Sequence, residues 1–426
     1  MLLEFTIKNY RSIAQRQKLS MVAEKAAPGR NRIATHNSLA PYALSSASIL
    51  GPNASGKTNL VRAFQFFQNF VLSSAKDRTE GEEIEITPFK LKPDFRTQPS
   101  EFEIKFVTKN YFYQYGFSID RNRVWGEWLF SRPSSPGVRM RELFQREYDK
   151  DTGTYDWQVN ENFVKGERET WKSATRDNAL FLSTAILLNS RSLIEPYQWI
   201  RDGIRYIRSP EGLSGNFSAK KCMDESYKNQ IVEFLKSTDL GVRDIAVKEE
   251  EATFPEIEKI FTEDVINYIK TNRSMKKYEV STIHSDSDGD NVEFSLNDES
   301  AGTIVLFNLA SPFLDVLSYG RTLIVDELDS SLHPHALRHL VELFNRPETN
   351  KNGAQLIFTT HDATILAGGV LNRDQIWLIE RGKHGGTHLF PLSDFSIREG
   401  AAYERSYLSG KFGALPKIRD FGRVEK

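Results

Sequence analysis

The sequence lacks the features that would place it outside ordinary globular proteins. It has one cysteine, Cys222, so no disulfide can form within the chain and a cysteine-based zinc site is excluded. No run of about 18 apolar residues occurs, so we expect no membrane span. Glu4, Lys8 and Arg11 interrupt the apolar core that a signal peptide requires. These absences predict a cytoplasmic protein.

Neither sign of charge dominates the sequence, whose formal net charge is −1. This balance argues against a dedicated nucleic-acid coat, because such proteins carry a large basic excess. Basic residues cluster locally at Arg121–Arg123, Arg139–Arg141 and Arg273–Lys277. We interpret these clusters as solvent-facing, with contact to nucleic acid or to a protein effector as the alternative. The length of 426 residues allows two or three domains, or one large α/β domain with insertions.

The segment Gly51–Thr58, which reads GPNASGKT, carries the strongest chemical signal. It lies between an apolar run, Ala47–Leu50, predicted as a strand, and Thr58–Val71, predicted as a helix. Small residues let backbone N–H groups surround phosphate oxygens, and the positive end of the following helix faces the same anion. The pattern predicts a P-loop with Lys57 on the β- and γ-phosphates of ATP and the hydroxyl of Thr58 on Mg²⁺. The ATP-binding residues expected here are Asn53, Ala54, Ser55, Gly56, Lys57, Thr58 and Asn59.

A second apolar segment, Thr322–Glu327, supplies the acids that a P-loop enzyme needs. It has buried-strand character and ends in Asp326, placed to hold hydrated Mg²⁺, and Glu327, placed to orient or deprotonate water. An apolar strand that ends in two acidic residues is common in proteins. It indicates a role in ATP hydrolysis here because the same chain contains a P-loop. Its distance from Lys57 in the sequence is too long for a compact small GTPase. We therefore expect a nucleotide-binding domain split by a large insertion.

Two further segments distinguish between P-loop classes. Ser300-Ala301-Gly302 begins an apolar helix, whose N-terminus can cap an anion. The alternative is an ordinary helix start with Ser300 as the capping residue. His361 directly follows a predicted buried strand, Gln355–Thr360, and Leu328–Pro334 follows the acids that end the earlier strand.

The order of these motifs resembles the ABC-type ATPase heads of the SMC, RecF and OLD group, over nearly the whole chain. The resemblance implies that Ser300 and Gly302 form a signature that caps the γ-phosphate held by the other subunit. It also implies that Asp329 belongs to a D-loop at the dimer interface and that His361 is a switch histidine near the γ-phosphate. Glu327 and His361 are thus the expected catalytic residues, and Thr58 and Asp326 the metal ligands.

The opening segment Asn9-Tyr10-Arg11-Ser12 is similar to that group's first strand, whose end approaches the nucleotide. Arg11 and Ser12 are therefore expected to contact ATP. More narrowly, ESAGT, ELDSSLHP and the closing segment Tyr407–Pro416 resemble stand-alone AAA15-type ATPases. These include the RloA and AbiLi subunits of two-gene phage-defence systems, with PtuA of Septu and AriA of PARIS as looser relatives.

The resemblance implies an α/β ABC-type ATPase head, with a mixed sheet, an antiparallel β subdomain and a helical insertion. We expect an N-terminal ATPase lobe at 1–158, a mainly helical insertion at 159–277 and a C-terminal ATPase lobe at 278–426. The implied protein forms a head-to-tail dimer, and its ATP turnover holds or activates a partner effector nuclease or toxin in abortive infection. A higher oligomer and direct contact with nucleic acid stay open. The competing classes are a RecF-like DNA-repair clamp and, less well matched, the ATP subunit of a transporter.

Several other groups of polar residues resemble ligand sites, but we interpret them as binding no ligand. His335 and His339, and likewise His384 and His388, lack a third metal ligand in the sequence, so we interpret them as surface histidines. His284 is interpreted as isolated. Asp286–Asp290 departs from the calcium-loop pattern in the position of its glycine and predicts a solvated hairpin turn.

Overall fold

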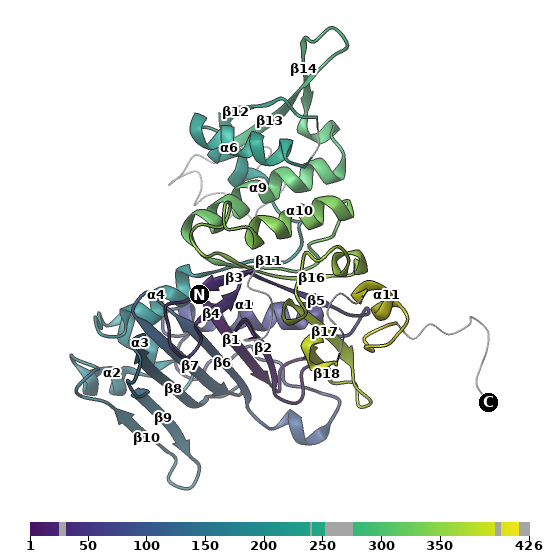
Figure 1. Ribbon diagram of the computed structural model, residues 1–426. Helices are drawn as coiled ribbons and strands as arrows, with labels where there is room; N and C mark the ends of the chain where they lie inside the picture. The colour runs from purple at the N-terminus through teal and green to yellow at the C-terminus, as the bar shows by residue number, and fades with distance from the viewer. Residues whose placement is uncertain (25–30, 239–240, 252–275, 397–401, 417–426) are drawn as a thin grey trace. The chain divides into compact units, whose positions relative to one another are not determined.

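The computed structural model describes residues 1–24, 31–238, 241–251, 276–396 and 402–416 (Figure 1). The chain divides into two compact units: unit 1 comprises Met1–Arg208, Val316–Asp329 and Leu340–Lys426, and unit 2 comprises Ser209–Asp315 and Ser330–His339. These bounds differ from the predicted domain bounds, because residues 159–208 belong to unit 1. Residues 252–275 of the predicted insertion, with the start of the basic cluster Arg273–Lys277, lie outside the described residues.

Unit 1 contains an antiparallel sheet, which among the described residues has the strand order β10-β9-β8-β7-β6-β1-β2. Alternate residues of its strands are buried, as Phe102, Ile104 and Phe106 show in β6. The chain turns between β7 and β8 at Asp120, whose Oδ1 accepts the Asn122 N–H at 2.7 Å. The strands are β1 (Leu2–Lys8), β2 (Gln17–Ser20), β6 (Ser100–Val107), β7 (Tyr111–Ile119), β8 (Val124–Pro133), β9 (Arg141–Asp149) and β10 (Thr154–Val159).

A second sheet of unit 1 has the order β11-β15-β16-β5-β17-β18 and is parallel except at β17–β18. Every residue of β5, β15 and β16 is buried, as expected for strands covered on both faces. The carboxyl ends of parallel strands meet at one edge, so the loops after these three strands converge there. The strands are β5 (Ser46–Leu50), β11 (Ile204–Ile207), β15 (Thr322–Val325), β16 (Gln355–Thr360), β17 (Ile376–Arg381) and β18 (Thr387–Pro391), besides the separate hairpin β3 (Arg32–Ala34) and β4 (Tyr42–Leu44).

Helix α1 (Lys57–Ser73) joins the two sheets of unit 1 into one core, and the predicted helix at Thr58–Val71 is confirmed (Figure 1). Its Phe64 stacks on Phe5 of β1 with ring centroids 3.8 Å apart, and Ile324 of β15 belongs to the same buried cluster. The predicted α/β class, with a P-loop sheet and an antiparallel β subdomain, is confirmed. The other helices of unit 1 are α2 (Arg168–Ala174), α3 (Phe181–Leu187), α4 (Ile194–Asp202) and α11 (Tyr403–Leu408), with 3₁₀ turns η1 (Pro93–Arg96), η3 (Ala363–Leu366), η4 (Arg373–Gln375) and η5 (Leu392–Asp394).

The segment 159–277, expected to be mainly helical, contains two strands among its described residues. They are β12 (Asp244–Glu251) in unit 2 and β11 in unit 1. In β12 the buried Ile245 lies two residues before the partly buried Val247, and the strand pairs with β13 (Lys276–Ser285). β13 then pairs with β14 (Asn291–Ser295), as the sequence predicts. Unit 2 also contains α5 (Asn216–Lys221), α6 (Glu225–Lys236) and η2 (Leu296–Asp298).

Two helices cross the boundary in sequence between the units, α9 (Ala301–Tyr319) and α10 (Pro334–Asn345). Among the described residues α9 is the one helix that is long and apolar enough to cross a membrane by length and composition. In the structure 61% of its most apolar window is buried, which is also what the core helix of a soluble protein shows.

Candidate nucleotide site

The loop between β5 and α1 forms the cradle that its sequence predicts. Ala54 and Gly56 have positive φ angles of 61° and 110°, which curl the backbone into a compact turn. Helix α1 begins at Lys57 with Gly56 at its N-cap, and no side chain caps it. The N–H groups of the first turn therefore remain available to an anion.

The two glycines of this loop leave no room for a side chain. A Cβ atom on Gly51 would lie 2.1 Å from the carbonyl oxygen of Ile379, in β17. A Cβ atom on Gly56 would lie 2.1 Å from Thr387 Oγ1, in β18. Strands β17 and β18 thus hold the loop closely from one side, which explains why these positions require glycine.

Lys57 lies folded over the loop, with Nζ donating to the carbonyl of Gly51 at 2.7 Å. Burial lowers the pKa of Lys57, whereas the nearby charges of Asp326, Glu327 and Asp329 raise it. The lysine of the P-loop and the acids that follow β15 therefore share one electrostatic environment. Lys57 and these acids are thus close in space, although they lie far apart in the chain.

A buried threonine joins the acidic residues to the neighbouring strand. Thr359 Oγ1, in β16, donates to Asp326 Oδ1 at 2.6 Å and accepts the Glu327 N–H at 2.7 Å. Asp326 is only 3% exposed, so this hydrogen bond fixes its orientation. Thr359 belongs to no motif of the sequence; the signal for it is a pair of hydroxyl residues at the end of an otherwise apolar strand.

Glu327, His361 and Asp329 come together after the ends of β15 and β16. His361 Nε2 lies 4.0 Å from Glu327 Oε1, and the His361 N–H donates to Asp329 Oδ2 at 3.1 Å. Glu327 adopts a left-handed backbone with φ 54°, which costs free energy in a residue other than glycine. Both side chains of the Glu327–His361 pair are partly exposed, at 47% and 39%, so a ligand can reach them.

The N-terminal segment reaches the P-loop through Ser12. Ser12 Oγ accepts a hydrogen bond from Asn59 Nδ2 at 2.8 Å, and Thr387 Oγ1 lies 2.8 Å both from that oxygen and from the Ser55 carbonyl. The exposed Arg11 instead donates from Nε to Tyr10 OH at 3.1 Å. The structure thus brings Ser12 and Asn59 together at the P-loop and adds Thr387, a residue that no sequence motif indicated.

The predicted signature belongs to unit 2, at the start of α9. Ser300 Oγ accepts the Thr303 N–H at 3.1 Å, so Ser300 is the capping residue of the helix, the alternative given above. Ser300 is exposed, and a Cβ atom on Gly302 would lie 3.0 Å from the carbonyl of Ser331 in the segment after Asp329. The interpretation of His284 as isolated is wrong, because its Nε2 lies 2.6 Å from Glu299 Oε1, directly before Ser300.

Unsatisfied polar atoms test whether the site fits ATP and Mg²⁺. Among the described residues, Ser55 Oγ and Asp329 Oδ1 are buried and have no hydrogen-bond partner. Burying a polar atom without a partner costs free energy, so both atoms are suited to a polar ligand. Phosphate oxygens and metal-bound water are ligands of that kind. The residues present therefore fit the nucleotide and its metal ion.

In the parts of the chain that the structure describes, no group of three or more His, Cys, Asp and Glu residues is arranged to hold a metal. His339 Nε2 instead lies 2.9 Å from Ser237 Oγ. Asp286–Asp290 forms the predicted hairpin turn, with Asp286 Oδ1 accepting the N–H groups of Asp288 and Asp290. Burial raises the pKa of the Cys222 thiol to about 12, which makes it unreactive.

The parallel sheet, the P-loop and the acids beside Lys57 define a P-loop ATPase with the motif order of the ABC type. The chain belongs to the family described as "AAA domain, putative AbiEii toxin, Type IV TA system", whose model matches residues 46–367. It is therefore an ATPase. No curated protein sequence matches the chain.

Several solved structures are similar over most of their length. The SMC head domain from Thermotoga maritima is 13% identical, with a TM-score of 0.40 over 92% of this chain and 98% of that one. RecF–ATP, of the RecFOR pathway, is 13% identical, with a TM-score of 0.31 over 92% and 99%. CbiO1 from Clostridium perfringens, part of the ABC transporter complex cbiONQ, is 12% identical, with a TM-score of 0.32 over 92% and 89%. These TM-scores are too low to support a functional argument.

Proposed function

We propose that this ATPase is the cytoplasmic regulatory subunit of an antiphage, abortive-infection type defence system. It forms a head-to-tail homodimer around two ATP molecules, and this dimer holds or activates a partner effector, a nuclease or other toxin encoded nearby. The family description, which names a toxin of a toxin–antitoxin system, supports this role. The motif resemblance described above supports it as well.

The proposal of a dimer rests on one observation, which is that Ser300 of the signature is exposed. Ser300 lies exposed at the N-terminus of α9, a helix of 19 residues, in unit 2. Lys57, Glu327 and His361 belong to unit 1. An exposed helix start with a hydroxyl group can cap an anion presented by a second copy of the chain. A second copy would complete each site by placing its Ser300 and Gly302 against the γ-phosphate.

The residues of one chain then divide the work of hydrolysis. Lys57 and the N–H groups of the P-loop bind the phosphates, and Thr58 and Asp326 hold Mg²⁺, which supplies positive charge against the transferred phosphoryl group. Glu327 orients the attacking water and accepts its proton. His361 lies beside Glu327, and Asp329 fixes the backbone of His361 through its carboxylate. Hydrolysis opens the dimer and ends the ATP-dependent hold on the effector.

The substitution Glu327→Gln tests the ATP-closed dimer. It keeps the size of the side chain but removes its charge, so we expect ATP to bind and hydrolysis to fall by about 10²–10⁴-fold. The ATP-bound dimer should then accumulate, measured as molar mass by light scattering after size exclusion. Glu348→Gln, on an exposed residue, is the control and should behave as wild type. Hydrolysis within a few-fold of wild type would move the catalytic role to another residue.

The defence role is tested with the product of the neighbouring gene. We expect it to copurify with wild-type protein in ATP and to protect cells from phage only beside an intact ATPase. Lys57→Ala should abolish protection. Equal protection by Lys57→Ala, or none from wild type with its neighbour, would contradict the role. A RecF-like clamp would instead bind duplex DNA in ATP and need no toxic partner.

A further inference from the structure

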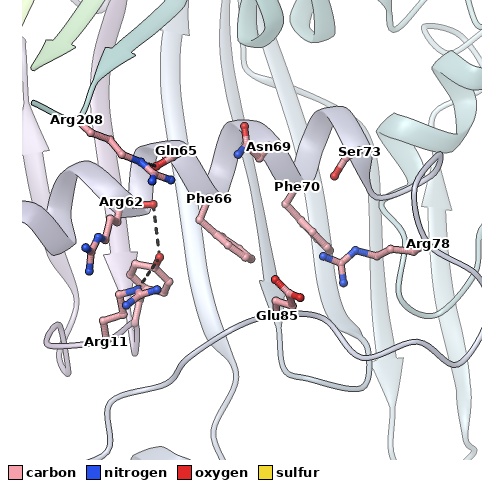
Figure 2. Close-up of a pocket in the computed structure, with 11 residues that line it drawn as sticks. Arg11, Arg62, Gln65, Phe66, Asn69, Phe70, Ser73, Arg78, Glu85 and Arg208 are labelled. Atoms are coloured by element: carbon pink, nitrogen blue, oxygen red, sulfur yellow. Dashed lines mark hydrogen bonds between the residues drawn. The ribbon is translucent and has the colours of Figure 1, made fainter. Parts of the chain in front are cut away.

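A groove on the exposed face of α1 extends beyond the expected nucleotide site, with which it shares only Arg11. It lies within unit 1, has a volume of about 520 Å³ and contains none of the residues from Gly51 to Asn59. Figure 2 shows Phe66 and Phe70 directed from α1 into the groove. Its lining includes four arginines, Arg11, Arg62, Arg78 and Arg208.

The positive charge of this groove is only partly offset by nearby carboxylates, among them the exposed Glu82, whose charge interacts with that of Arg78. Among the described residues none of the four arginines forms an ion pair. Arg78 instead donates to the Glu83 carbonyl at 2.9 Å, and Arg208 Nε donates to Gln65 Oε1 at 3.0 Å. The one carboxylate in the lining is that of Glu85, which is exposed. A groove with several unpaired guanidinium groups favours an anionic ligand, because arginine binds phosphate through two parallel hydrogen bonds.

Aromatic rings between the arginines indicate that the ligand also has flat apolar groups. The rings of Phe66 and Phe70 are nearly parallel, at 11°, with centroids 5.7 Å apart. Phe66 is only partly buried, and the Arg78 guanidinium lies 5.6 Å from the centre of the Phe70 ring. Phe70 is only 2% exposed, so Phe66 is the ring that a base can reach. A partly exposed aromatic ring with arginines nearby is a surface on which unpaired bases stack. The amides of Gln65 and Asn69, also in the lining, can hydrogen-bond to base edges.

The length of the groove distinguishes a strand from a single nucleotide. Its lining runs along α1 from Arg62 to Ser73, which is about 16 Å at a rise of about 1.5 Å per residue. Stacked nucleotides of one strand are about 3.4 Å apart, so the groove accommodates several of them. We propose that the groove on α1 binds a segment of single-stranded nucleic acid, with phosphates on the arginines and bases stacked at Phe66. This activity goes beyond the proposed function and needs neither the effector nor the second subunit.

The binding is measured by fluorescence anisotropy with unstructured 12-nucleotide RNA and DNA strands and a 12-base-pair duplex, without ATP. We expect a single strand to bind more tightly than the duplex, because its bases are free to stack. Phe66→Leu keeps an apolar side chain but removes the ring, and should weaken binding about fivefold or more. Arg62→Ala and Arg208→Ala should each lower the slope of log affinity against log salt by about 0.7.

Three controls separate the groove from general charge and from the ATP site. Arg139→Ala removes one exposed arginine outside the groove and should leave affinity nearly unchanged. Glu85→Gln should tighten binding, because it removes the negative charge in the lining. The circular dichroism spectrum of Phe66→Leu should match wild type. The RNA and DNA arms show which kind of strand is preferred.

Several results would overturn the proposal. Duplex binding as tight as strand binding, or equal losses from Arg139→Ala and Arg208→Ala, would indicate diffuse charge instead of the groove. Displacement of the strand by a poly-glutamate peptide of equal charge at the same concentration would indicate a peptide site. An increase in the KM for ATP in Phe66→Leu, with strand affinity unchanged, would make the groove part of the nucleotide site. Failure of the defence experiment leaves all these measurements unaffected.

Discussion

Gly56 combines a positive φ with a close approach from β18. An alanine at this position would have a strained backbone at φ 110°, and its Cβ would lie 2.1 Å from Thr387 Oγ1. We expect Gly56→Ala to lower the free energy of unfolding by about 1–3 kcal/mol. It should also abolish ATP retention on a filter, because the loop must move away from Thr387.

Gly81 is the matched control for this substitution. It also has a positive φ, of 82°, but no atom lies within 4 Å of the place its Cβ would take. Gly81→Ala therefore tests backbone strain without a clash and should retain ATP binding. If both variants lost the same stability and the same ATP retention, the cause would be the positive φ and not the clash with Thr387.

Lys57 links ATP binding to pH. Its pKa is lowered from the ordinary 10.5 by burial, more than the three nearby carboxylates raise it. Added phosphate charge would raise the pKa again, so ATP binding should take up protons at alkaline pH, and affinity should fall as pH rises above the lowered pKa. Calorimetry in two buffers with different ionisation enthalpies measures this uptake. Lys57→Ala should lose ATP binding, and Lys76→Ala, on an exposed lysine, should behave as wild type.

The same shift has a consequence for folding with a definite sign. A lysine whose pKa is lower in the folded state binds its proton more weakly there than in the unfolded chain. Between the lowered pKa and the ordinary value, stability without nucleotide should therefore rise with pH. The Lys57→Ala variant should lack this contribution in urea titrations at several pH values. A wild-type stability that falls with pH, relative to this variant, would contradict the direction of the shift.

At the scale of elements, the hydrogen bonds of Thr359 hold the ends of β15 and β16 together. Thr359→Val keeps the shape of the side chain but leaves Asp326 and the Glu327 N–H without their partner. We expect a loss of about 1–3 kcal/mol in the free energy of unfolding. The kcat for hydrolysis should fall more than ATP affinity, because Glu327 loses its support. Thr359→Ser retains the hydroxyl and should restore kcat; failure of this rescue would assign the effect to packing.

The elements that carry the nucleotide site could be predicted because their signals are local. Strands β5, β15 and β16 appear in the sequence as short apolar runs, followed by the glycine of the P-loop after β5, by acidic residues after β15 and by histidine after β16. Helix α1 has apolar residues at helical spacing directly after a phosphate-binding loop. In such segments the pattern of burial and the local chemistry favour the same structure. Contacts with distant parts of the chain therefore do not override the locally preferred strand or helix.

The elements that the sequence did not reveal depend on distant partners. β12 carries an acidic end, Glu249–Glu251, which looks like a solvated helix face until Lys276 of β13 pairs with Glu249. Thr387 contacts Ser12 from the other end of the chain, and no spacing in the sequence indicates this. His284 reaches Glu299 only because β13 and η2 bring them together. Such contacts are decided by strand pairing and topology.

At the scale of the whole molecule, the proposed dimer depends on a signature that acts in trans. Ser300→Arg should leave the P-loop of its own subunit intact but block the site of its partner. Lys57→Ala should damage the P-loop of its own subunit but leave the site of its partner intact. Each variant alone should be inactive, and a mixture should contain heterodimers with one site carrying both lesions and one carrying neither. If the two sites hydrolyse ATP independently, we expect recovery to about a quarter of wild-type ATPase activity.

Lys57→Ala mixed with Glu327→Gln is the matched control, because both lesions lie on the same side of each site. Every heterodimer of that mixture has two damaged sites, so no recovery is expected. Equal activity of the two mixtures would argue against independent shared sites. Sites that must act together would also prevent recovery, and the ATP-bound Glu327→Gln dimer distinguishes this case. In its structure Ser300 Oγ should lie within about 3 Å of the partner's γ-phosphate. A dimer with ATP bound and Ser300 facing solvent would contradict the trans mechanism.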